Sequence, residues 1–170
     1  MLNKLMSLIN GLEERDLNEG ITENDINELG FILIRNNSLL PMYNISIAGA
    51  FMANKEAIGR DDVPMIVVDD YFYSLSNNTK VFIIGHELGH FQSNHEKQYG
   101  GCVRKIDDEF EADEYGAKLV GYQSAIFAIE EMEDLFKNLF EGFEELIKGT
   151  INEFEIRIEK LLSKANITLC

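Results

Sequence analysis

Two histidines lie four residues apart in the segment HELGH, and a glutamate directly follows the first: His86, Glu87 and His90. Residues four apart on an α-helix share one face, about one turn apart. Both imidazoles can therefore point toward one metal ion, while Glu87, about 100° further round, lies beside it. Zinc hydrolases use this pattern, with imidazoles as ligands and the carboxylate as the base for a bound water. The residue types and spacing predict a hydrolytic Zn²⁺ site.

A catalytic zinc needs a third protein ligand, and the segment DDEFEADE offers several carboxylates. Glu109 and Asp113 are four residues apart and share a helix face, whereas Glu111 lies about 200° from Glu109. We expect Glu109 to bind the metal and Asp113 to hydrogen-bond a ligand imidazole, which fixes its tautomer. Glu111 and His95 stay open as alternative ligands. If the first helix continues, His95 lies about 140° round from His90.

Small residues on both predicted helices indicate that the two helices pack closely. Gly85 and Gly89 flank the histidines, and Ala112, Gly116 and Ala117 lie among the carboxylates. A glycine inside a helix costs about 1 kcal/mol relative to alanine, so its presence suggests a packing or access requirement. An ordinary amphipathic helix is the weaker explanation of the motif, because all three histidines of the chain fall within ten residues.

The rest of the chain predicts the elements that position these residues. Apolar spacing predicts helices over 2–15 and 22–36, strands within 43–54 and 63–73 joined by the polar segment 55–62, a histidine helix over 80–97, a helix over 109–120, and amphipathic helices over 122–162. This order predicts an α+β fold in one domain, 1–170. Its parts are N-terminal helices (1–37), a catalytic core (44–121) and acidic amphipathic helices (122–170).

Composition restricts the partners of the chain. Its 170 residues carry a formal charge of −15, which repels phosphate backbones and disfavours nucleic acid. No segment approaches the roughly 20 apolar residues of a membrane span, and the N-terminus lacks the apolar run of a signal peptide. Two cysteines, Cys102 and Cys170, are too few for a disulfide framework. These features predict a cytoplasmic protein with reduced thiols.

The segment HELGHFQSNH followed by EFEADEYGAKLVG resembles the gluzincin metallopeptidases, in particular the catalytic core of the CAAX prenyl protease and membrane heat-shock protease family. That family pairs HExxH with a downstream ExxxD helix, and the resemblance spans about residues 44 to 121. It implies a small zincin-like sheet beside the active-site helix. It also implies that zinc is bound by His86, His90 and Glu109, with Glu87 as general base and Asp113 supporting a ligand.

The sequence departs from that family in two respects. Its members are integral membrane proteins whereas this chain predicts no span, and the spacing in this chain is short. We therefore do not expect their membrane substrates. The segment HELGHF with a downstream EAD is also similar to the small soluble ImmA/IrrE metallopeptidases, which cleave regulatory proteins.

The predicted function is that of a zinc metalloendopeptidase acting on a peptide or protein substrate. Tyr115 and Tyr122 are candidates for stabilising the oxyanion by their chemistry, although such a residue is more often a packing aromatic. The segment MIVVDD is a candidate sheet edge for an extended peptide. The alternative is a zinc-binding regulatory or protein-interaction module that acts through its acidic helical C-terminus. A hydrolase with a substrate other than a peptide also stays open, because zinc-hydroxide chemistry is general.

Overall fold

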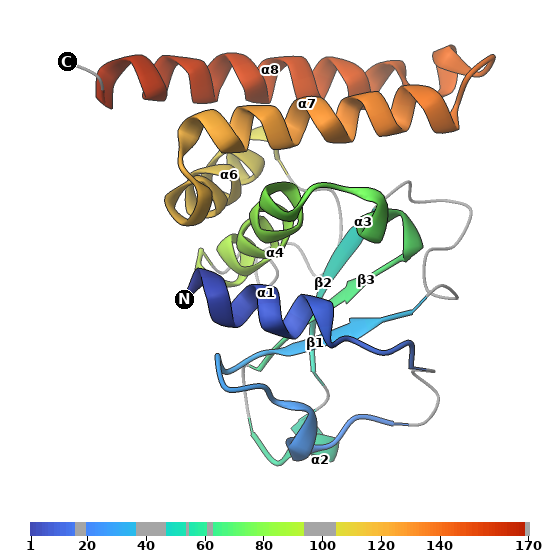
Figure 1. Cartoon of the computed structure of the whole chain (residues 1–170), viewed down its shortest axis with the longest axis vertical. Coiled ribbons are helices and arrows are strands. Elements are labelled where there is room, and N and C mark those ends of the chain that lie inside the picture. The colour runs from blue at the N-terminus through green and yellow to red at the C-terminus, as the bar shows by residue number, and fades with distance from the viewer. Residues whose placement is uncertain (16–19, 37–46, 54, 61–62, 94–104, 169–170) are drawn as a thin grey trace. The chain divides into compact units, whose positions relative to one another are not determined.

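The computed structural model describes residues 1–15, 20–36, 47–53, 55–60, 63–93 and 105–168 (Figure 1). The chain divides into two compact units, Met1–Ser74 and Leu75–Cys170. The first holds a small sheet with short helices, and the regular elements described in the second are helices. The predicted α+β class is therefore confirmed.

A three-stranded sheet forms the centre of the N-terminal unit, with strand order β1-β3-β2. Its strands are β1 (Ile32–Arg35), β2 (Ala48–Met52) and β3 (Pro64–Val68). The central strand β3 runs parallel to β1 and antiparallel to β2, so that Val67 pairs with Ile34 on one side and Gly49 on the other. The β-branched residues of β1 and β3 suit a pleated, buried surface.

Four short helices accompany the sheet: α1 (Leu2–Asn10), the 3₁₀ helix η2 (Glu23–Asp25), α2 (Lys55–Ile58) and α3 (Asp70–Ser74). One face of the sheet contributes to an apolar cluster made of Ile32, Ile34, Ala53, Ile58, Val63, Met65 and Val67, with Ile21 and Ile26 packed against it. At the end of β3, Asp69 accepts a hydrogen bond from the backbone N–H of Phe72 at 3.0 Å, which starts α3.

The prediction of a helix over residues 22–36 is wrong. Only η2 is helical there, Gly30 adopts a φ of +87°, and Ile32–Arg35 forms β1. A positive φ cannot continue a right-handed helix. The last three residues of the run FILI belong to a strand buried over most of its length, and such a continuous apolar run has the same appearance as a buried helix segment.

The predictions for the strands also need correction. The segment MIVVDD is not the expected sheet edge, because its residues Met65–Val68 lie in the central strand β3 and pair on both sides. Residues 71–73, predicted at the end of a strand, lie in α3, and the polar connection over 55–62 contains α2. The predicted catalytic core over 44–121 crosses the division at Ser74, because its first part belongs with the sheet and its second with the C-terminal helices. The single domain over 1–170 stays a prediction.

Four helices make up the described part of the C-terminal unit: α4 (Asn77–Gln92), α6 (Ile106–Val120), α7 (Tyr122–Leu139) and α8 (Glu144–Thr168). The predicted helices over 80–97, 109–120 and 122–162 thus exist with shifted ends; residues 94–97 lie outside the described part. Gly121, with a φ of +89°, separates α6 from α7. The helices α7 and α8 lie side by side, joined by a short turn (Figure 1).

The start of the histidine helix is fixed by side chains of two elements. Ser76 is the N-cap of α4, and its Oγ accepts a hydrogen bond from the backbone N–H of Thr79 at 3.4 Å. Glu131 of α7 accepts hydrogen bonds from the backbone N–H and the Oγ of Ser76, both at 2.8 Å, and from the hydroxyl of Thr79. The position of α4 along its axis is therefore tied to α7.

In the part of the chain that the structure describes, no helix combines the length and apolar character needed to cross a bilayer.

Candidate metal centre

The two histidines of the motif lie one turn apart on α4, as the spacing predicts. His86 is 7% exposed and His90 is fully buried. Their rings meet edge to face with centroids 4.6 Å apart, and their Nε2 atoms are 3.0 Å apart. Each ring therefore presents the same nitrogen to a shared point.

Glycines allow α6 to approach this face of α4 closely. A Cβ atom added at Gly89 would lie 2.8 Å from the Cα of Ala112, and one added at Gly85 would lie 2.9 Å from the Cα of Gly116. On the opposite helix, a Cβ at Gly116 would lie 2.9 Å from the carbonyl oxygen of Phe82. These distances are shorter than real Cβ contacts. The predicted close packing of the two helices is confirmed.

The close approach brings Glu109 of α6 to the histidine pair. Its carboxylate oxygens lie 3.2 Å from Nε2 of His86 and 3.6 Å from Nε2 of His90. Glu111, the competing carboxylate, is exposed on another face of the same helix. Asp108, which precedes Glu109, has a different role. Its carboxylate accepts a hydrogen bond from the backbone N–H of Lys105 at 2.9 Å and so caps the N-terminus of α6.

The spacing of the ligand side chains is close to that of a zinc site. Zinc binds imidazole nitrogen and carboxylate oxygen at about 2.0–2.2 Å, so a tetrahedral site separates its ligand atoms by roughly 3.3–3.6 Å. The two Nε2 atoms here are 3.0 Å apart, Oε2 of Glu109 lies 3.2 Å from Nε2 of His86, and Oε1 of Glu109 lies 3.6 Å from Nε2 of His90. Among the described residues, one group of His, Cys, Asp and Glu side chains could hold a metal ion: His86, His90 and Glu109. One ligand atom from each of them lies within 4.8 Å of the others. Three such ligands leave the fourth position of a tetrahedral ion for water.

Asp113 lies one turn after Glu109 and supports the first histidine. Its Oδ1 is 2.8 Å from Nδ1 of His86, and the side chain is 1% exposed. An ionised carboxylate only accepts, so Nδ1 of His86 carries the hydrogen of this bond. In the neutral ring the lone pair is then on Nε2, the atom that faces Glu109.

The pKa values of His86 and Glu109 reflect these contacts. Burial lowers the pKa of His86, but the hydrogen bonds to Asp113 and Glu109 outweigh it and raise this pKa to about 9. Burial likewise raises the pKa of Glu109, and the contact with His86 outweighs it and holds this pKa well below its usual range. A metal ion binding to His86 would therefore displace a proton.

Arg157 of α8 joins the centre and was not predicted from the sequence. Its guanidinium donates to both carboxylate oxygens of Asp113, from Nε at 2.8 Å and from Nη2 at 2.6 Å. A signal was present, since Phe154 and Leu161 lie three residues before and four residues after Arg157 and are buried on the same helix. A cation within an apolar stripe needs a buried partner.

Four further residues were candidates for a role in the site: Glu87, His95, Tyr115 and Tyr122. Glu87 is 7% exposed on α4, and its role as general base stays a prediction. His95 lies outside the described residues. Tyr115 packs beside Gly89, with its Cβ 2.9 Å from the position of an added Cβ there, and Tyr122 is half-buried at the start of α7. Their proposed part in oxyanion stabilisation stays a prediction.

Comparison with known proteins found no match to a protein-family model, to a curated protein or to a solved structure. The candidate metal centre is therefore supported by its residues and their geometry.

Proposed function

We propose that this chain is a zinc-dependent metalloendopeptidase of the gluzincin type. The observation that carries the proposal is the convergence of two Nε2 atoms and one carboxylate at 3.0–3.6 Å, close to the separations of ligand atoms in a tetrahedral zinc site. The HExxH motif and the downstream ExxxD helix, which resemble the gluzincins, support a hydrolytic site. A peptide or protein substrate and a cytoplasmic location belong to the same proposal.

Each residue has a distinct chemical task in this proposal. A bound zinc would lower the pKa of water toward 7 and polarise the carbonyl of the substrate. Glu87 accepts a proton from the attacking water and transfers it to the departing amine. His86 and His90 supply neutral nitrogen ligands, and Glu109 supplies an anionic oxygen. Asp113 holds the ring of His86 in its Nδ1–H tautomer.

The proposal is tested by separating metal binding from turnover. The purified chain is loaded with zinc, its metal content is measured, and hydrolysis is followed on a mixed peptide library by mass spectrometry. We expect one zinc per chain and new amino termini in the products. Glu87→Gln should retain the zinc and lower turnover by about 10²–10⁴-fold. Wild-type protein that binds zinc and leaves all peptides intact would contradict the proposal.

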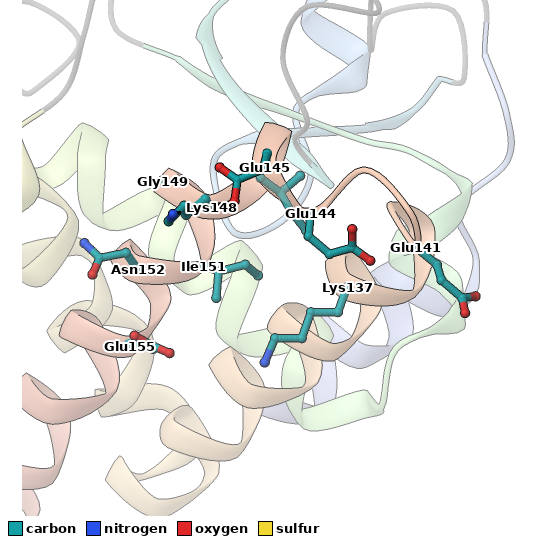
Figure 2. Close-up of a pocket in the computed structure, with 10 residues that line it drawn as sticks. Lys137, Glu141, Glu144, Glu145, Lys148, Gly149, Ile151, Asn152 and Glu155 are labelled. Carbon is teal, nitrogen blue, oxygen red and sulfur yellow. Dashed lines mark ion pairs between the residues drawn. The ribbon is translucent and has the colours of Figure 1, made fainter.

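A second candidate function has its own observation, a groove of about 920 Å³ beside the turn between α7 and α8 (Figure 2). Four glutamates and two lysines line it: Glu141, Glu144, Glu145, Glu155, Lys137 and Lys148. Both lysines already contact glutamates, Glu133 and Glu145 respectively. Phe143 and Leu146, which belong to the same turn region, are 64% and 72% exposed.

These features fit a protein-interaction module whose partner is a basic, amphipathic peptide segment. The apolar side chains would be covered by the partner, and the excess of carboxylates would pair with its lysines or arginines.

The two functions respond differently to substitution. Phe143→Ser together with Leu146→Ser should abolish binding of basic amphipathic peptides, measured by fluorescence anisotropy, and Glu87→Gln should leave that binding unchanged. Equal binding of acidic and basic peptides would exclude this module.

A further inference from the structure

The side chain of Arg157 lies in the interior of the C-terminal unit, and it is 6% exposed. It forms a two-pronged contact with Asp113, in which Nε and Nη2 each donate to a different carboxylate oxygen. Oδ1 of Asp113 accepts the hydrogen bond from Nη2 at 2.6 Å, and it also accepts one from Nδ1 of His86 at 2.8 Å. Arg157, Asp113 and His86 therefore form a connected group from α8, α6 and α4, in which Nη2 of Arg157 also lies 3.4 Å from Nδ1 of His86.

From this geometry we propose that Arg157 is a positioning residue of the metal centre, acting through Asp113 on His86. The inference rests on the proposed zinc site and extends it, because it makes the C-terminal helix α8 part of that site. Arg157 fixes the plane of the Asp113 carboxylate. That plane fixes the ring of His86, and the ring then directs its Nε2 toward the metal.

The chemistry of the two side chains explains why an arginine suits this position. A planar guanidinium donates two parallel hydrogen bonds to a carboxylate, which restricts rotation of the carboxylate about its last bond. A single-point donor leaves that rotation free. Buried charge is also tolerated only when it is paired and hydrogen-bonded. Arg157 therefore gives Asp113 both a fixed orientation and a counter-charge.

The cation of Arg157 does not exclude a divalent metal, because carboxylates surround it. Besides Asp113, Glu109 and Glu153 have oxygens 3.8 Å from its Nη1 atom. Three carboxylates and one guanidinium carry a net charge of −2 when both histidines are neutral. The charge around Arg157 is therefore negative and does not repel a cation at the Nε2 atoms.

A simpler role for Arg157 would be to hold α8 against α6, and the chain contains a matched control for that role. Lys164 of α8 contacts Glu114 of α6 at 2.6 Å, an ion pair between the same two helices that is not part of the metal group. Loss of either pair weakens contact between the helices. Only loss of Arg157 should change the metal centre.

The test compares full-length Arg157→Met, Arg157→Lys and Lys164→Met with the wild type. Zinc affinity is measured by competition with a chromophoric chelator, and the ligand geometry by the visible spectrum of the Co²⁺-loaded protein. Arg157→Met should lower zinc affinity about 10–100-fold, the usual effect of losing a group that orients a ligand, and should alter the Co²⁺ spectrum. Arg157→Lys should recover part of the affinity. Lys164→Met should match the wild type in both measurements.

A double-mutant cycle with Asp113→Asn tests whether Arg157 acts through that carboxylate. Removing Arg157 in the Asp113→Asn background should lower zinc affinity no further. Fully additive losses, or wild-type affinity and spectrum in Arg157→Met, would overturn the proposal. If Arg157→Met does not fold, the cycle is made with Arg157→Lys and judged by the same criterion. A wild type that binds no zinc overturns the proposed function as well, whereas an unaffected Arg157 variant overturns only this inference.

Discussion

At the scale of single residues, the ligand set follows from spacing within two helices. Residues i and i+4 share a helix face, so the pairs His86 with His90 and Glu109 with Asp113 could be predicted to act together. Arg157 could not be placed in the same way, because it is 44 residues from Asp113 in the chain. Its contact depends on how α8 packs, and periodicity within one segment does not report packing between segments.

The assignment of the third ligand is tested at the same scale. Glu109→Ala should lower zinc affinity by more than about a hundredfold, exceeding the usual loss for an orienting group, because a direct ligand is removed. Isothermal titration with zinc measures the effect. Glu111→Ala is the matched control, since Glu111 is an exposed carboxylate on the same helix. Equal affinities for Glu109→Ala and wild type would exclude Glu109 as a ligand.

At the scale of elements, the proposed metal centre depends on the close contact between α4 and α6. The small residues of both helices predicted this contact, and the distances at Gly85, Gly89 and Gly116 agree. The sheet was less predictable. The strands β2 and β3 lie within predicted segments, but β1 was taken for a helix, because an apolar run of four residues fits either structure. The strand order also requires pairing between distant segments.

Gly89→Ala tests the helix contact directly. The added Cβ would meet the backbone of Ala112, which cannot move aside as a flexible side chain does. We expect a loss of about 1–3 kcal/mol in the free energy of unfolding, the usual cost of overpacking. Denaturant unfolding in the presence of a chelator measures this loss without a contribution from metal.

The matched control for this substitution is Gly149→Ala on α8, where an added Cβ would meet no atom within 4 Å. This variant should be more stable than the wild type by about 0.5–1 kcal/mol, because alanine favours the helix. A Gly89→Ala variant as stable as the Gly149→Ala variant would contradict the packing of α4 on α6.

The end of β3 gives a pH prediction at the same scale. Burial raises the pKa of Asp69 from an ordinary 3.8 to about 6, against the lowering effect of the N–H groups of Phe72 and Tyr71. The folded chain therefore binds the proton more tightly than the unfolded chain. The stability from this group is present below pH 4 and is lost as the pH rises through 6, by up to about 3 kcal/mol.

Asp69→Asn removes this titration and keeps an oxygen that can accept the N–H of Phe72. Between pH 4 and pH 7, the free energy of unfolding of the wild type should fall relative to that of the variant. Urea unfolding at several pH values measures the difference. A constant difference across this range would show that the Asp69 pKa is close to its unfolded value.

At the scale of the whole molecule, the charge of −15 should act on substrate encounter. An acidic surface attracts basic peptides at long range, and salt screens that attraction. For the proposed peptidase, kcat/KM for a lysine-rich peptide should fall about tenfold or more between 20 and 500 mM NaCl. An uncharged peptide with the same cleavage sequence is the control, and its kcat/KM should hardly change. Equal salt dependence for both peptides would contradict electrostatic steering.

The division of the chain at Ser74 has a consequence for how this protein can vary. All three candidate metal ligands belong to the second unit, which begins at Leu75. The same unit contains Asp113 and Arg157, which support the ligands. Substitutions or insertions in the first 74 residues therefore leave the set of candidate metal ligands unchanged. The part of the chain that carries the sheet can therefore diverge, by natural drift or by engineering, without removing a ligand of the proposed zinc site.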